Sequence, residues 1–258
     1  MKRKLISLAA ASAVVAAHTA AGHTTYGGTA RDLGTVVPSI NEPYFKTIDN
    51  QTVTSNFGWA AGTDSDRLGN AHDIKAFRFT LAGAGMATIS VSGAARGTGL
   101  QTFLPAFSLY SGLLHTSVAD YDTAAITLSY LATLGGTQPK NGAFNALDTW
   151  KIGNDEGTTF ADLSTLTYLG NAADGTSSNF GGAAGANGDG LADGAVQQSF
   201  WLPAGDYTLV IGGADVSGSD LTGTYGINAS LAVIPEPSAA LLAGLAAIGL
   251  LVRRRTPD

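Results

Sequence analysis

The segment AGANGDGLADG, Ala184 to Gly194, spaces oxygen-bearing groups at odd intervals between small residues. Its candidate ligands are the side chains of Asn187, Asp189 and Asp193 and the carbonyl of Leu191. Alternate oxygens in a tightly curled loop can converge on one hard cation, which predicts a calcium site. However, Gly185 stands where an EF-hand has its first carboxylate, and Val196 stands where it has a bidentate Glu. A Gly/Asp surface turn without an ion accounts for the same residues.

A second acidic segment, GTDSDRLGNAHD, precedes the first clear strand pattern. Its candidate calcium ligands are Asp64, Asp66 and Asp73, because a loop at the end of a sandwich can gather carboxylates around an ion. Solvated turn acids explain this segment equally well.

Three tryptophans could stack on sugar rings: Trp59, Trp150 and Trp201. Trp201 lies in a strand pattern between Phe200 and Leu202, so one of the two aromatic residues should face the core. Trp150 falls in a turn-rich segment, which makes it the preferred carbohydrate candidate. Ordinary packing is the default role of such side chains.

No catalytic motif accompanies these residues. The chain has neither a G-x-S-x-G elbow nor an H-E-x-x-H zinc motif. Of the four histidines, only His72 and His115 lie well inside the chain, and the absence of cysteine excludes disulfides, thiolate metal sites and cysteine nucleophiles. We therefore expect a non-enzyme, with a secreted hydrolase as an alternative.

The two ends of the chain differ from its polar, glycine-rich middle. Residues 1–22 have a basic start and a short apolar stretch, which is the layout of a signal peptide. Near the other end, residues 238–252 form an uncharged apolar run of 15 residues that predicts a transmembrane helix when its flanks are counted. Three arginines follow at once and favour the cytoplasmic side. A buried core helix with a basic cap is the alternative.

Residues 234–258 resemble the PEP-CTERM sorting tail of Gram-negative bacteria. The resemblance rests on three parts in the expected order: the tripeptide Pro235, Glu236 and Pro237, the apolar run, and the basic end Arg253, Arg254 and Arg255. It implies that the protein crosses the inner membrane and that an exosortase, a membrane-embedded cysteine protease, cuts near the motif. It further implies delivery to the cell surface or the extracellular polysaccharide matrix.

The part between the signals is acidic. Six of the 14 Lys and Arg residues lie in the two signals, and only two of the 20 acids do, so residues 23–233 carry a net charge of about −10. Such a surface argues against nucleic acid as a partner, because nucleic acid requires basic surface.

Period-two patterns predict strands throughout this part. The inward-facing sets are Phe77, Phe79 and Leu81; Ile89 and Val91; Phe107 and Leu109; Ile126, Leu128 and Tyr130; Tyr207, Leu209 and Ile211; and Tyr225, Ile227, Ala229 and Leu231. No sustained helical period accompanies them. We therefore expect an all-β fold, a single jelly-roll-like β-sandwich over residues 23–233 with long Gly/Asp-rich loops.

The order of the strands gives a second, weaker resemblance, to bacterial pre-peptidase C-terminal domains. It rests on IKAFRFTLAGAGMATISVSG, FSLYSG, FWLPAGDYTLVIGGAD and GTYGINASL. It implies a jelly-roll-like sandwich with a binding or maturation role, interrupted by a loop-rich insertion at about residues 111–195.

Three functions follow as hypotheses. The first is a non-catalytic surface or matrix protein associated with exopolysaccharide or biofilm. The second is a module that binds calcium or carbohydrate, and the third is a secreted hydrolase.

Overall fold

The computed structural model describes residues 24–39, 42–60, 68–99, 102–114, 125–134, 143–152, 159–181, 183–216 and 223–235. These ranges contain twelve β-strands and one α-helix. The predicted all-β class is therefore confirmed. The predicted signal peptide and the apolar run at residues 238–252 lie outside the described residues.

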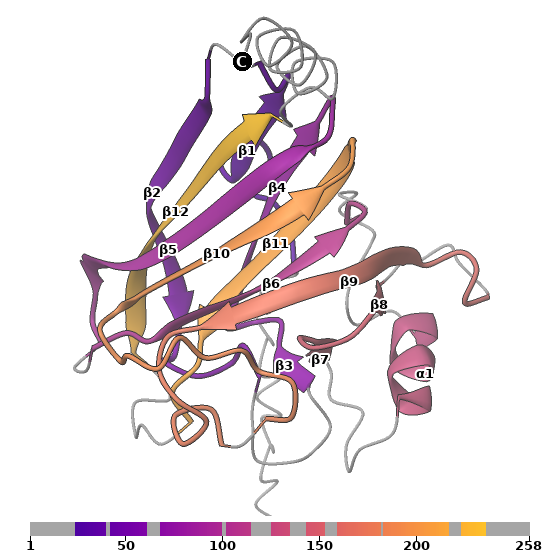
Figure 1. The fold of residues 1–258 in the computed structure, drawn as a ribbon. Helices are drawn as coiled ribbons and strands as arrows, with labels where there is room; N and C mark the ends of the chain where they lie inside the picture. The colour runs from indigo at the N-terminus through magenta and orange to yellow at the C-terminus, as the bar shows by residue number, and fades with distance from the viewer. Residues whose placement is uncertain are drawn as a thin grey trace, which may run out of the picture.

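Two sheets form a β-sandwich (Figure 1). The six-stranded sheet has the spatial order β1 (Asp32–Val36), β4 (Lys75–Leu81), β11 (Gly205–Gly213), β6 (Pro105–Ser111), β9 (Ser164–Ala173) and β8 (Trp150–Ile152). The four-stranded sheet has the order β10 (Ala195–Leu202), β5 (Gly85–Gly97), β12 (Thr224–Pro235) and β2 (Tyr44–Thr54). A small third sheet pairs β3 (Leu68–Asn70) with β7 (Ala143–Asn145).

The main hydrophobic core lies between the two large sheets. Alternate side chains of both sheets enter it, as the period of a strand with one inward face requires. The predicted inward-facing sets on β4, β5, β6, β11 and β12 all belong to this core, which confirms their assignment.

A second hydrophobic cluster covers the opposite side of the six-stranded sheet. It includes the buried side chains of Trp59, Ala76, Tyr110, Trp150, Leu166 and Val210. The central strands β6 and β11 are therefore buried on both faces. The four-stranded sheet differs, because the outward side chains of β5, β10 and β12 are exposed or half-buried. Its outer face is the broad sheet surface that a ligand can reach.

One predicted strand is a helix in the structure. Residues Ala125–Thr133 form α1, although Ile126, Leu128 and Tyr130 fit a period of two. Leu128 and Leu131 lie one helical turn apart, and Leu131 is buried in the second cluster while Leu128 packs against it. Ala and Leu are also good helix formers. The prediction of a strand here was wrong because, in so short a segment, the same apolar residues can also line one face of a helix.

The segment at about residues 111–195 was predicted as a loop-rich insertion. The structure shows α1, β7, β8 and β9 within it, and β9 pairs with β6 along the six-stranded sheet. The segment therefore supplies part of the sheet and its cover. In the described part of the chain, no helix is both long enough and apolar enough to cross a membrane.

Candidate functional site

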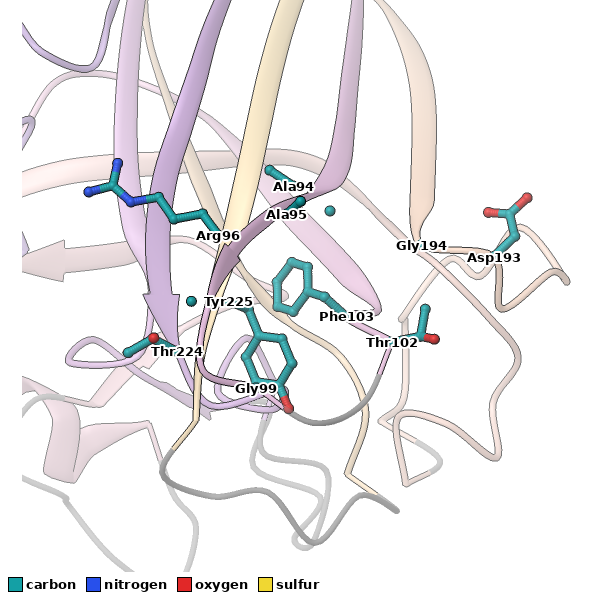
Figure 2. A pocket seen from close by; sticks show the side chains of 12 residues that line it. Ala94, Ala95, Arg96, Gly99, Thr102, Phe103, Asp193, Gly194, Thr224 and Tyr225 are labelled. Atoms are coloured by element: carbon teal, nitrogen blue, oxygen red, sulfur yellow. The ribbon is translucent and has the colours of Figure 1, made fainter.

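Two neighbouring pockets lie along β5 of the four-stranded sheet. Their volumes are about 410 and 350 Å³, and Asp193 lines both of them. The first pocket lies at the glycine-rich end of β5 (Figure 2). The second lies over the middle of β5, between β10 and β12. We call the two together the β5 groove.

Aromatic rings form the base of the first pocket. Phe103 and Tyr225 are stacked, with ring centroids 5.3 Å apart, and they lie in the middle of the pocket in Figure 2. A Cβ atom added at Gly99 would lie 2.2 Å from the Tyr225 ring, so the chain can pass this close only as glycine. Arg96 lies on one side of the rings and Asp193 on the other. The Arg96 guanidinium donates to the carbonyl of Asn50, which ties β5 to β2.

Small polar side chains form the floor of the second pocket. Ser90, Ser92 and Ser230 contribute hydroxyls, and Gln197 contributes a side-chain amide. The Ser90 hydroxyl donates to the Gln197 amide oxygen at 3.0 Å, which orients the amide. A primary amide also carries two N–H donors, so Gln197 has donors to offer a ligand. The floor itself bears no charge.

The wall of the groove is the loop that carries Asp189 and Asp193, and a buried carboxylate holds it in place. Asp174 follows β9 and has no exposed surface. Its two oxygens accept the backbone N–H groups of Asp193 at 3.0 Å and Gly194 at 2.6 Å. Burial raises the pKa of Asp174 to about 6, against the effect of these two hydrogen bonds, and the nearby Asp189 and Asp193 add to the rise.

The match to a protein-family model concerns the export and processing of the protein. Residues 233–255 match the PEP-CTERM protein-sorting motif. The chain carries a PEP-CTERM sorting signal. It is therefore an exported protein that exosortase processes at the membrane, as the three-part tail predicted. Pro235 of the motif ends β12, while Glu236, Pro237 and the three arginines lie outside the described residues.

Two of the solved structures that resemble this chain are those of copper-binding proteins. One is CorA, a surface-associated copper-binding protein important in copper acquisition by Methylomicrobium album BG8. It is 13% identical to this chain with a TM-score of 0.44, and the match covers 77% of this chain and 97% of that chain. The other is MopE, a secreted copper-binding protein of Methylococcus capsulatus. It is 18% identical to this chain with a TM-score of 0.40, and the match covers 80% of this chain and 87% of that chain. Neither likeness assigns a function or a residue to this chain. No curated protein matches the chain.

The predicted calcium loop uses its carboxylates to hold its own backbone. The Asp189 Oδ1 atom accepts the N–H groups of Gly175 and Leu191, each at 3.0 Å, and the Asp193 Oδ1 atom accepts that of Ala195 at 3.2 Å. Among the described residues, no group of three or more His, Cys, Asp or Glu side chains gathers where it could hold a metal ion. The structure therefore lends no support to calcium at Asn187, Asp189, Leu191 and Asp193.

The second predicted calcium segment is described only in part. Asp64 and Asp66 lie outside the described residues. Asp73 accepts a hydrogen bond from the Asn70 side-chain amide at 2.7 Å. Burial raises the pKa of Asp73 to about 6. The one hydrogen bond described for the Asp73 carboxylate therefore stabilises the turn from Asn70 to Asp73.

Trp150 is not a sugar platform. It belongs to β8 and is completely buried, with its ring centroid 5.5 Å from that of Phe144. A ring without an exposed face cannot stack on a sugar, so this prediction was wrong. Trp201 is 48% exposed, while Phe200 packs against the core, as one of this aromatic pair was expected to do.

His72 is the one histidine in the part of the chain that the structure describes. Its backbone N–H donates to the Asn70 side-chain oxygen at 3.1 Å, within the turn that also holds Asp73.

The sequence analysis did not predict the role of Asp174, whose carboxylate holds the backbone of Asp193 and Gly194. Its only sequence signal is an Asp-Gly pair directly after a strand pattern.

Proposed function

We propose that the exported sandwich is a non-catalytic surface or matrix module that holds a neutral polysaccharide in the β5 groove. The observation that carries this proposal is the uncharged floor of the groove, where hydroxyls and the Gln197 amide lie beside the carboxylates of Asp189 and Asp193. Sugar hydroxyls both donate and accept hydrogen bonds, and this set of groups offers partners for each role.

The charge of the protein selects the kind of polysaccharide. The two carboxylates at the wall and the net charge of about −10 of residues 23–233 repel polyanions. A neutral chain of sugars meets no such barrier. The two pockets follow one another along β5 and share Asp193, so together they suit a stretch of a long chain and do not require a chain end.

Binding to the exopolysaccharide of the native host tests this proposal. The mature protein is run in native gels that contain the purified polysaccharide, and retardation gives the affinity. We expect Gln197→Ala to weaken retardation at least about fivefold, since a lost hydrogen bond to a ligand costs about 1 kcal/mol. Ser199→Ala is the matched control, because Ser199 lies on the same strand and bonds Thr88 as Gln197 bonds Ser90, but does not line the groove.

Two results would count against the proposal. Equal retardation of the wild type, Gln197→Ala and Ser199→Ala would show that the groove is not the binding site. Shortening of the polysaccharide during incubation with the pure protein would favour the hydrolase alternative.

A further inference from the structure

An apolar patch lies on the four-stranded sheet, at the end opposite the first pocket. It consists of Phe45, Met86, Trp201 and Ile234, which are 70%, 38%, 48% and 57% exposed. We call these four residues the exit patch. Their neighbours along each strand, such as Ala87, Leu202 and Val233, point into the core, so the patch residues point outward.

Strand register brings the exit patch together from four strands. Met86 of β5 lies opposite Trp201 of β10 on one side and opposite Ile234 of β12 on the other. Phe45 of β2 lies opposite Ala232, two residues before Ile234 on the same face. Strands β10 and β12 run in the same direction on either side of β5 (Figure 1). Neighbouring strands are about 4.8 Å apart, so the patch spans about 15 Å.

The sorting signal begins inside this patch. Ile234 is followed by only Pro235, Glu236 and Pro237 before the apolar run starts at Ser238. Four residues reach at most about 14 Å even when fully extended. While the tail is uncut and held in the membrane, Ile234 cannot lie farther than this from the start of the membrane segment, and the rest of the exit patch lies within two strands of Ile234.

We propose that the exit patch rests in the headgroup layer of the lipid bilayer while the PEP-CTERM tail is still attached. Tryptophan is enriched at membrane–water interfaces, where its apolar ring and its N–H group both find suitable surroundings. The patch contains no charged side chain, so lipid contact requires no charge to lose its water. The tail makes this contact intramolecular, which gives a high effective concentration.

Cleavage of the tail removes this advantage. Four side chains without a tether bind a bilayer weakly, so the processed protein leaves the membrane. The patch thus orients the sandwich with the Met86 end of β5 at the membrane and the Gly97 end, with the first pocket, away from it. This proposal rests on the sorting signal and is independent of the polysaccharide proposal.

Lipid quenching of tryptophan fluorescence tests the contact. The full-length protein is inserted into phosphatidylcholine vesicles that contain brominated acyl chains, in the absence of exosortase. Trp59 and Trp150 are completely buried in the sandwich, so they serve as internal references. We expect bromolipid to quench part of the emission, and Trp201→Phe to lose that quenched part. The same variants without residues 236–258 should show no quenching.

Quenching of equal size in the wild type and in Trp201→Phe would overturn the proposal. Quenching of Trp201 that appears only after exosortase is added would assign the patch to the protease and would also overturn it. Neither result would bear on polysaccharide binding, which the groove variants test separately.

Discussion

The carboxylate of Asp174 accepts the backbone N–H of Gly194 at 2.6 Å, across 20 residues of chain. This bond joins the end of β9 to the start of β10, strands that belong to different sheets. Because the same carboxylate also holds Asp193, one buried side chain sets the position of the groove wall.

We expect Asp174→Ala to lower the free energy of unfolding by about 2–3 kcal/mol, since two hydrogen bonds to a charged group are lost. Urea denaturation of the mature protein measures this. Asp49→Ala, at an exposed position on β2, should change the value by less than about 0.5 kcal/mol. Equal effects of the two variants would remove Asp174 from its anchoring role.

The raised pKa values of Asp174 and Asp73 predict a pH dependence of stability. Each pKa is about 6 in the folded protein, against 3.8 ordinarily, so the folded state binds protons more tightly than the unfolded state. Their charged forms therefore cost stability above pH 6, and this cost is relieved as the pH falls from about 6 towards 4.

Asp174→Asn isolates one of these contributions. We expect the wild type to lose less stability, or to gain more, than this variant when urea denaturation is moved from pH 7 to pH 5. Identical changes in the two proteins would show that the Asp174 carboxyl titrates normally.

Truncation of Trp150 should destabilise the protein strongly, whereas truncation of Trp201 should change its stability little. Trp150→Ala is expected to lower the free energy of unfolding by about 3–5 kcal/mol, because it empties a fully buried site between Tyr110 and Phe144. Trp201→Ala should stay within about 0.5 kcal/mol of the wild type in solution. A small effect at Trp150 would contradict its place in the core.

The sorting signal predicts a separable role for Glu236. Two prolines flank Glu236 and favour an extended backbone, which presents its carboxylate just before the membrane segment. We expect Glu236→Ala to leave export across the inner membrane intact but to block cleavage, so that membrane fractions contain the heavier, uncut protein. Wild-type maturation of this variant would contradict the role of Glu236.

The basic end of the tail predicts a different defect. Replacing Arg253, Arg254 and Arg255 by Ala removes the charge that favours the cytoplasmic side. We expect uncut protein to appear beyond the inner membrane, and immunoblots of the fractions would detect it. Complete retention would show that the apolar run alone suffices.

Sequence patterns predicted the fold best where a strand buries only one face. The alternation in β5 and β12 identified their core side chains, because the four-stranded sheet keeps one face in contact with water. In β6 this pattern is absent, since residues from Pro105 to Tyr110 are all buried. The second cluster that causes this burial comes from distant segments.

The site was less predictable because it depends on contacts between segments. The Gly/Asp-rich loop was recognised, but its acids were assigned to calcium, whereas Asp189 and Asp193 accept backbone N–H groups of the loop itself. Trp150 was placed in a loop because a three-residue strand leaves no periodic pattern. The partners of Asp174 lie 19 and 20 residues away, a distance at which no local pattern links them.

The position of β12 has a mechanical consequence. It lies between β5 and β2, is antiparallel to both, and ends where the sorting tail begins. If a polysaccharide is held near the Gly97 end of β5 while the tail is anchored, tension pulls β12 and β5 in opposite directions along their length. Their hydrogen bonds lie across this direction and are loaded together, in shear, instead of opening one by one. The sorting tail is therefore attached to a strand whose hydrogen bonds to its neighbours resist pulling along the tail.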